Sequence, residues 1–287
     1  MKNVKIATAV LAALVAGSVM AGPDADKIAA TGVKVFQKSK MQGFDRIIFE
    51  YEGCEAWVVE PAKAAEGSPW AWCMEWPTAF QNRTGVKALL EAGYRWVTFN
   101  PAYAKHGNKA TAGNQNDEMI AKRRKFQEFL INTLGLEKRV CLIGMSWGGF
   151  YSIRYASTHP ECIKAIYIDA PLLDFSTLAG FKTKSWKDLA KFYPGLTADY
   201  VGADDPMQPV HHTRAEKIAK AKIPILCVYG GSDTVVPAES NCMRFAEAFE
   251  KAGGHILMWR DNKRGHHPHG LEPNESNVFL NFFNSAK

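Results

Sequence analysis

One serine of this sequence stands where a nucleophile could act. Ser146 is the centre of a G-x-S-x-G pentapeptide at residues 144–148, between an apolar run at 140–143 and a helical stretch that ends near His159. A tight strand–turn–helix of this kind holds its central residue in a strained backbone conformation and exposes the side chain above the sheet. It also places the serine Oγ near free N–H groups at a helix start, which favour negative charge on a substrate oxygen. The pattern therefore predicts nucleophilic catalysis by Ser146.

Three aspartates are candidates for the acid that such a serine requires. A serine hydroxyl needs a base to accept its proton, and the base needs a carboxylate that orients it. Asp233 follows the apolar run 223–229 in the sequence GGSDTVVP, where a loop at the carboxyl end of a strand is expected. We predict Asp233 as the acid. Asp169, directly after the apolar run 162–168, is a rival for the same role, and Asp174 is a third candidate.

The candidate base lies in a histidine-rich loop, GHHPHG at residues 265–270, which follows the apolar run 255–259. The order along the chain is then serine, acid, histidine. Three histidines compete, and His266, directly after Gly265, is predicted as the base. The three histidines also suggest a metal site, but the loop is cramped and has no accompanying carboxylate or cysteine spacing. We therefore predict neither a metal nor a cofactor.

Strands and helices alternate along the remaining sequence, which predicts an α/β fold. Near-continuous apolar strands indicate a mostly parallel sheet covered by helices on both faces. Eight runs have strand character: residues 46–51, 54–60, 69–74, 95–100, 139–143, 162–168, 223–229 and 255–259. Helical character is expected, besides the stretch after Ser146, at residues 84–92, 118–134, 212–221, 237–252 and 274–284.

Residues 172–209 interrupt this alternation after the sixth strand. They are predicted to form a short insert over one end of the sheet. The insert contains Phe181, Trp186 and Tyr193, which either line a pocket or pack the insert down. Further aromatic side chains are expected near the predicted site: Trp72, Trp76 and Trp147.

The first residues have the features of a secretory signal peptide. Two lysines precede an apolar stretch at 6–16, and a small-x-small pattern predicts cleavage after Ala21. The apolar stretch is shorter than the roughly 20 residues that span a bilayer, and an uncleaved anchor is the alternative. We expect a signal peptide at 1–21 and a single domain at 22–287. The mature protein is then expected in the periplasm or outside the cell, without a membrane partner.

The composition bounds the remaining possibilities. A hydrophobic fraction of 47% and a charged fraction of 22% are ordinary for a globular protein. The net charge of +6 comes from scattered Lys and Arg, so no nucleic-acid partner is expected. An oxidising compartment permits disulfides, and Cys54 with Cys73 is the pair most suspected. Cys141 and Cys227 lie in apolar strands and are expected to be buried thiols.

Together these motifs resemble those of the α/β-hydrolase superfamily. The pentapeptide at 144–148, the DTVVP run at 233–237 and the Gly265-His266 pair occur in the family's order. In many members the catalytic histidine lies seven residues before a proline that opens the last helix. Pro273 has this spacing from His266, which favours His266 over His269. The resemblance covers essentially the whole mature chain and implies the α/β-hydrolase fold with an eight-stranded sheet.

A narrower resemblance, to a little-characterised group of exported bacterial hydrolases, comes from WAW at 70–72, YIDAP at 167–171 and HHPHG at 266–270. The wider family implies an oxyanion hole made of two backbone N–H groups. One belongs to Trp147, directly after the nucleophile. The other lies in the loop after the third strand, where relatives often read His-Gly and this chain reads WCMEW at 72–76. The N–H of Glu75 is preferred, and Met74 and Trp76 remain open.

These expectations combine in an exported serine hydrolase that cleaves carboxylic esters through Ser146, His266 and Asp233 and an acyl-enzyme intermediate. Its substrate is expected to be a small-molecule or carbohydrate-borne ester. A serine peptidase of the same fold is the alternative, and a non-catalytic binding protein on a hydrolase scaffold is a more distant one. The sequence leaves the substrate and the oligomeric state open.

Overall fold

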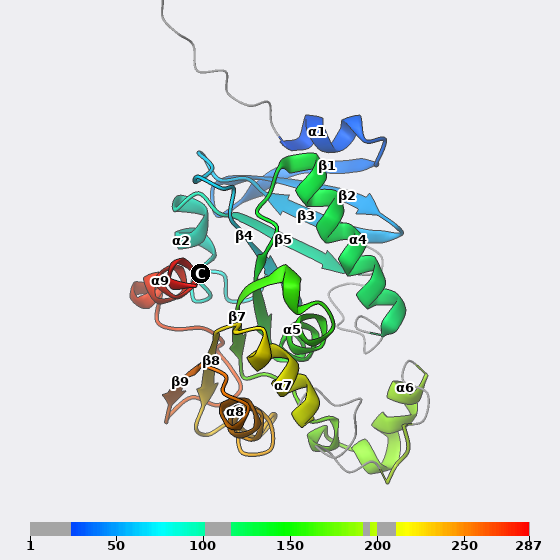
Figure 1. Cartoon of the computed structure of the whole chain (residues 1–287), viewed down its shortest axis with the longest axis vertical. Helices are drawn as coiled ribbons and strands as arrows, with labels where there is room; N and C mark the ends of the chain where they lie inside the picture. Colours follow the sequence, from blue (N-terminus) through cyan, green and yellow to red (C-terminus); the bar gives the residue numbers. More distant parts are fainter. Residues whose placement is uncertain (1–23, 101–115, 192–195, 200–210, 287) are drawn as a thin grey trace, which may run out of the picture.

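The computed structural model describes residues 24–100, 116–191, 196–199 and 211–286. Within these ranges the strands form one sheet in the order β1-β2-β3-β5-β4-β6-β7-β8-β9 (Figure 1). Pairing is antiparallel from β1 to β5 and parallel from β5 to β9. The strands are β1 (Val35–Met41), β2 (Phe44–Tyr51), β3 (Cys54–Val59), β4 (Trp70–Cys73), β5 (Arg95–Asn100), β6 (Val140–Met145), β7 (Ile163–Asp169), β8 (Ile225–Gly230) and β9 (Ile256–Asp261).

Helices cover both faces of the sheet, as the sequence predicts, and each face has its own hydrophobic cluster. Buried side chains of α1, α4, α5, α7 and α8 belong to one cluster, and those of α2 and α9 belong to the other (Figure 1). The helices are α1 (Asp24–Ala30), α2 (Val86–Glu91), α4 (Asp117–Leu134), α5 (Trp147–Thr158), α6 (Trp186–Ala190), α7 (His212–Lys220), α8 (Cys242–Lys251) and α9 (Asn277–Ser285).

The long helix α4 shows how local sequence sets these elements. It begins after Asn116, whose side chain accepts a hydrogen bond from the Met119 N–H at 2.9 Å. It ends at Gly135, which takes a left-handed conformation with φ 68°. Its buried residues recur at helical spacing and include Phe126 and Leu130, which are fully buried against the sheet.

The structure has one strand more than the sequence predicts. β1 is absent from the eight predicted runs because it reads VFQKSKM and buries only Met41. It pairs with β2 at one edge of the sheet, and an exposed edge strand needs no apolar pattern. The short helix α1 was also not predicted. The predicted signal peptide at 1–21 lies outside the described residues. Among the helices that are described, none is both long enough and apolar enough to cross a bilayer.

The suspected disulfide between Cys54 and Cys73 is wrong. Cys54 at the start of β3 and Cys73 at the end of β4 belong to the clusters on opposite faces of the sheet. β5 lies between the two strands, so they are about 10 Å apart. Two Cα atoms more than about 7 Å apart cannot be bridged without backbone movement. All six cysteines are free buried thiols, and burial raises the pKa of Cys141 and Cys227 as expected for such groups.

The described parts of the insert form short helical turns beyond β7. These are η3 (Phe175–Thr177), η4 (Phe181–Ser185) and α6, which lies at the lower right of Figure 1. Phe181 is buried in the core cluster and Trp186 packs against that cluster, so both hold the insert down. Tyr193 lies outside the described residues.

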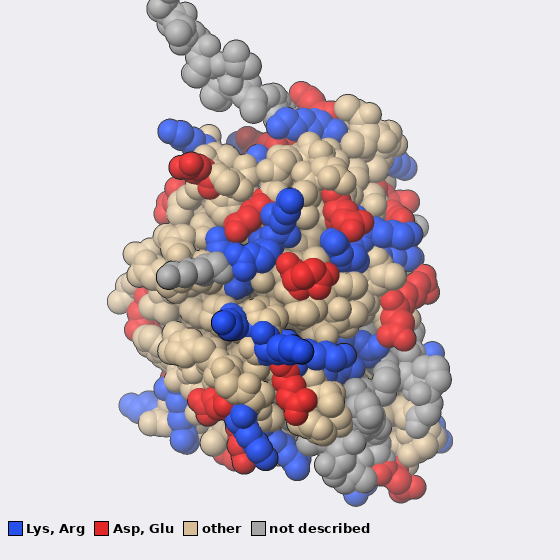
Figure 2. All heavy atoms as spheres, viewed as in Figure 1, with Lys and Arg blue, Asp and Glu red and all other residues tan. Residues whose placement is uncertain are grey.

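The molecular surface carries charges of both signs. On the face seen in Figure 2, Lys and Arg side chains are interspersed with Asp and Glu. This mixture agrees with the scattered basic residues of the sequence.

Candidate active site

The turn after β6 brings Ser146 to the carboxyl end of the sheet. Ser146 has φ 51° and ψ −116°, a strained conformation for a residue with a side chain. The turn requires glycine on both sides of the serine. A Cβ on Gly144 would lie 2.3 Å from the Gly148 carbonyl oxygen, and one on Gly149 would lie 2.2 Å from the Cβ of Pro171. The sequence therefore folds here into the tight strand–turn–helix that it predicts.

The three residues predicted as nucleophile, base and acid lie together. His266 Nε2 is 3.1 Å from Ser146 Oγ, and His266 Nδ1 is 2.8 Å from Asp233 Oδ2. With a proton on Nδ1, the ring donates to the carboxylate and its Nε2 lone pair accepts the serine hydroxyl. The side chains of His266 and Asp233 are 8% and 2% exposed, so the pair is shielded from water while Ser146 faces a pocket.

Asp233 is held by its own loop as well. Its Oδ1 accepts hydrogen bonds from the backbone N–H groups of Val235 and Val236, both at 2.9 Å. Oδ2 is thereby left to face the imidazole of His266. The carboxylate thus fixes both the turn after β8 and the orientation of the ring.

The rival acid Asp169 contacts His269 and not His266, the histidine that faces Ser146. Asp169 is fully buried at the end of β7, and its Oδ1 lies 2.7 Å from His269 Nδ1. Its Oδ2 accepts from the Tyr167 hydroxyl at 2.9 Å and from the Gly270 N–H at 2.8 Å. The guanidinium of Arg264 lies 3.4 Å from Oδ1. Asp169 therefore fastens the histidine loop to the sheet.

The third candidate acid, Asp174, has a local role. Its Oδ1 accepts hydrogen bonds from the Ser176 N–H at 2.8 Å and from the Ser176 hydroxyl at 2.6 Å at the start of η3. It caps that turn rather than facing His266.

Two positioning side chains were not predicted. Arg264 is 4% exposed and donates to the Gly270 carbonyl at 2.6 Å. Asn241 is fully buried and accepts from the N–H groups of Leu173 and Asp174, so it ties the insert to the segment before α8. Neither residue belongs to a recognisable motif, because Asn241 acts on backbone groups far away in the sequence and Arg264 contacts the side chain of the distant Asp169.

The backbone near the serine favours one of the three candidate second donors. The Met74 N–H donates to the Ile143 carbonyl at 2.9 Å, and the Trp76 N–H donates to Glu75 Oε1 at 3.1 Å. Glu75 packs against the serine turn, since a Cβ on Gly148 would lie 3.4 Å from its backbone nitrogen. Trp147 begins α5, where the helix provides no internal acceptor for the N–H group.

A pocket of about 700 Å³ opens beside Ser146. One wall comes from the insert and another from the loop after Asp233, and most of the lining side chains are apolar. Of the aromatic residues expected near the site, Trp147 lines this pocket, whereas Trp72 is fully buried in the core and Trp76 packs on the opposite face. The lining residues are Ser146, Trp147, Leu172, Thr177, Leu178, Ala179, Ser185, Asp188, Leu189, Thr234, Val235 and Val236.

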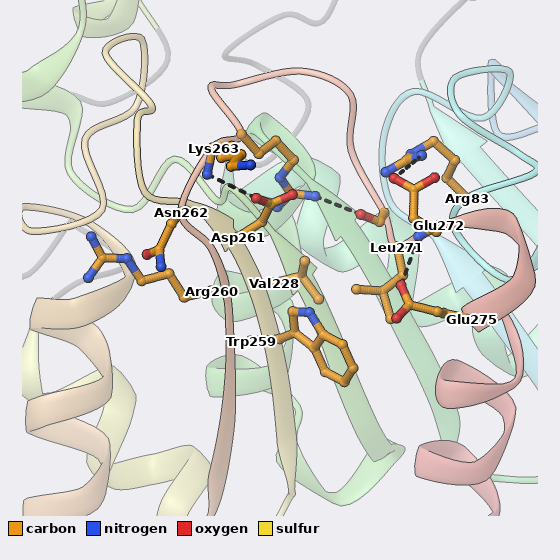
Figure 3. Close-up of a pocket in the computed structure, with 12 residues that line it drawn as sticks. Arg83, Val228, Trp259, Arg260, Asp261, Asn262, Lys263, Leu271, Glu272 and Glu275 are labelled. Carbon is orange, nitrogen blue, oxygen red and sulfur yellow. Dashed lines mark hydrogen bonds and ion pairs between the residues drawn. The ribbon is translucent and has the colours of Figure 1, made fainter.

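A second pocket, of about 310 Å³, lies at the carboxyl end of β9 (Figure 3). Arg83 and Glu272 face each other on one side of it at 3.0 Å, and Arg260 and Asn262 lie on the other side. Its charged side chains are of both signs, and Ser146 is not among its lining residues. The larger, apolar pocket is therefore the one that gives access to the serine.

The three histidines of the loop lie close together. The ring centroids of His266, His267 and His269 are 4.8 to 5.0 Å apart. His267 is exposed and stacks on Phe80, with ring centroids 5.5 Å apart. Burial, followed by the neighbouring His269 and His266, lowers the pKa of His267.

The comparisons with known proteins agree with this architecture. A family model described as the α/β hydrolase fold matches residues 76–208. No curated protein sequence matches this chain. The resemblance to the α/β hydrolases is confirmed at the level of the fold, and this chain has the α/β-hydrolase fold.

Solved structures give the same result. The S-formylglutathione hydrolase of Agrobacterium tumefaciens superposes with a TM-score of 0.59 at 14% identity, covering 87% of this chain and 98% of that one. An esterase of Pyrococcus furiosus gives 0.52 at 16% identity, with coverage of 88% and 89%. The acylaminoacyl peptidase of Pyrococcus horikoshii gives 0.58 at 14% identity over 90% of this chain, which spans only 42% of that peptidase. At such identities the likeness establishes the fold.

Proposed function

We propose that this α/β-hydrolase-fold protein is a serine hydrolase of carboxylic esters, with Ser146 as nucleophile, His266 as base and Asp233 as the orienting acid. The observation that carries the proposal is the continuous chain from Ser146 Oγ to His266 Nε2 at 3.1 Å and from His266 Nδ1 to Asp233 at 2.8 Å. Ser146, the first residue of this hydrogen-bonded series, lines an apolar pocket that gives a substrate access to it. A serine with a base and an orienting acid beside a pocket is the arrangement for acyl transfer.

The reaction follows from the positions of these groups. His266 Nε2 accepts the hydroxyl proton while Ser146 Oγ attacks the ester carbonyl. The Asp233 carboxylate stabilises the imidazolium that forms. His266 then protonates the leaving alcohol, and the acyl group remains on Ser146. Water, deprotonated by the same ring, attacks the acyl-enzyme and restores the serine.

The oxyanion of the tetrahedral intermediate is assigned to the backbone N–H groups of Trp147 and Glu75. Trp147 supports this assignment by its place at the start of α5. Glu75 is preferred because its backbone nitrogen packs against the serine turn, 3.4 Å from where a Cβ on Gly148 would lie. Each donor of this kind typically lowers the barrier by about 3 kcal/mol.

The pocket supports an ester that carries an apolar group. Half of its lining residues are aliphatic, among them Leu172, Leu178 and Leu189. The acidic residue of the lining, Asp188, is bonded to Lys191 at 2.8 Å, which gives little support to recognition of a free amino group. An ester is therefore preferred to an aminopeptidase substrate. Assays of nitrophenyl esters against aminoacyl anilides decide between them: faster turnover of the anilides would replace the esterase by the peptidase.

The test of the nucleophile is covalent labelling with a fluorophosphonate, which reacts with activated serines. We expect the wild-type protein to be labelled and Ser146→Ala to remain unlabelled. Ser185→Ala is the matched control, because Ser185 lines the same pocket but bonds the Ala179 carbonyl at 3.0 Å. Equal labelling of the wild type and Ser146→Ala would end the proposal.

We also propose that the protein is exported. Support comes from the sequence alone, from the two lysines, the apolar stretch at 6–16 and the cleavage pattern at Ala21. Mass spectrometry of the amino terminus of the protein from a periplasmic or secreted fraction tests this proposal. A retained residue 1 would overturn cleavage at Ala21.

A further inference from the structure

The histidine loop concentrates metal-binding nitrogens beside the serine. His266, His267 and His269 each offer a ring nitrogen within 4.8 Å of those of the other two. Imidazole nitrogens suit Zn²⁺, Cu²⁺ and Ni²⁺ among divalent ions. The loop sequence alone argued against a metal because no carboxylate accompanied the histidines, but the fold supplies two.

Two of the three rings are held as metal-binding histidines usually are. His266 Nδ1 is 2.8 Å from Asp233, and His269 Nδ1 is 2.7 Å from Asp169. A carboxylate behind Nδ1 fixes the proton there, so that the lone pair is on Nε2. Both carboxylates are almost completely shielded from water, with side chains 2% and 0% exposed. Each carboxylate contacts one ring: Asp233 from the loop after β8, and Asp169 from the end of β7.

We propose that His266, His267 and His269 form a binding site for a divalent transition-metal ion of the Zn²⁺ type, and that the bound ion inhibits hydrolysis. The inhibition rests on the proposed function, because it arises at the base of that mechanism. A metal ion on His266 Nε2 takes the lone pair that accepts the Ser146 proton. The ring cannot serve both partners at once, so the ion and the serine compete. Water completes the coordination of the ion.

The geometry requires one adjustment, and the structure allows it. Nitrogens around a tetrahedral Zn²⁺ lie roughly 3.3 Å apart for Zn–N bonds of about 2.0 Å. His266 and His269 are fixed by their aspartates, whereas His267 is exposed and turns toward them by leaving its stacking contact with Phe80. The Arg264 guanidinium, 3.4 Å from Asp169, offsets part of that carboxylate's attraction for a cation. Two ligands are fixed, one must turn, and a positive charge lies nearby, so we expect the ion to bind reversibly.

The experiment is a Zn²⁺ titration of ester hydrolysis by the full chain in chelator-free buffer. We expect complete inhibition that EDTA reverses. In His267→Ala, the Zn²⁺ concentration that halves the activity should rise at least tenfold, while the activity without metal stays within twofold of wild type. His255→Ala is the matched control: His255 is also exposed, but it precedes the amino end of β9, opposite the serine. Inhibition of His267→Ala at the wild-type Zn²⁺ concentration would overturn the site.

Calorimetry separates this proposal from the proposed function. The six thiols are buried, so they do not compete for the ion in the folded protein. Ser146→Ala should still bind one Zn²⁺ per chain, at least as tightly as wild type, because the competing hydroxyl is gone. If Zn²⁺ binding requires His267 but the protein has no esterase activity, the metal site is supported and the proposed esterase function is rejected. If the protein has esterase activity but binds no Zn²⁺, only the metal site is rejected. Circular dichroism of His267→Ala verifies that the variant is folded.

Discussion

Two aspartate–histidine pairs lie side by side at the carboxyl end of the sheet, and they differ in what surrounds them. Asp233 with His266 and Asp169 with His269 have nearly equal N–O distances, 2.8 and 2.7 Å. The ring centroids of the two histidines are only 5.0 Å apart. The His266 ring meets Ser146 on its other nitrogen, beside an open pocket.

The second pair is enclosed instead. Asp169 is fully buried and also accepts hydrogen bonds from Tyr167 and Gly270, with Arg264 close by. A carboxylate surrounded by donors stabilises the loop, whereas one that faces a ring in contact with a serine can support proton transfer. The comparison teaches that the partner on the far side of the ring, rather than the pair itself, decides between catalysis and stability.

The largest expected effect breaks the first pair at its ring. His266→Ala should lower kcat for a nitrophenyl ester by about 10⁶-fold, because no base then accepts the serine proton. The melting temperature should change little, since Asp233 keeps its bonds to Val235 and Val236. Steady-state kinetics and thermal unfolding measure the two effects. A variant that retained a tenth of the wild-type activity would show that His266 is not the base.

The next effect removes the charge of the first carboxylate. Asp233→Asn should lower kcat about 10⁴-fold, because the amide no longer stabilises the imidazolium or selects its tautomer. Asp188→Asn is the control, a carboxylate that lines the pocket but is bonded to Lys191, and it should stay within a few fold of wild type. Equal losses in the two variants would contradict the assignment of Asp233.

The same change in the second pair should act on stability. Asp169→Asn leaves the buried Arg264 guanidinium without its charge partner, which costs about 3–5 kcal/mol of the free energy of unfolding. We expect the melting temperature to fall by about 10 °C. Urea unfolding measures the loss. The folded variant should lose much less activity than Asp233→Asn, and the reverse order would assign the catalytic acid to Asp169.

The smallest effect trims one donor from the second pair. Tyr167→Phe removes the hydroxyl that donates to Asp169 at 2.9 Å, a bond worth about 1.5 kcal/mol. Burial raises the pKa of Tyr167, so its hydroxyl stays protonated and remains a donor. We expect a small loss in urea unfolding and an unchanged kcat. A tenfold lower kcat with unchanged stability would mean that the second pair takes part in the chemistry.

Much of the fold could be predicted from the sequence because its parallel strands other than β9 are almost entirely buried and read as apolar runs. The edge strand β1 could not, because only Met41 of its seven residues is buried. The Cys54–Cys73 pairing failed for a related reason: spacing along the chain does not tell which face of the sheet a side chain occupies.

For the candidate site, the sequence by itself determined the strained turn at Ser146, because only glycines fit its close contacts, and the order of serine, acid and histidine. It left three aspartates and three histidines in competition, although it favoured Asp233 and His266. The tertiary structure alone decided which of them meet, since β7 and β8 carry Asp169 and Asp233 to different histidines of one loop. Such pairings join residues 33 and 100 positions apart, and hydrogen bonds over that span depend on how strands are ordered in the sheet.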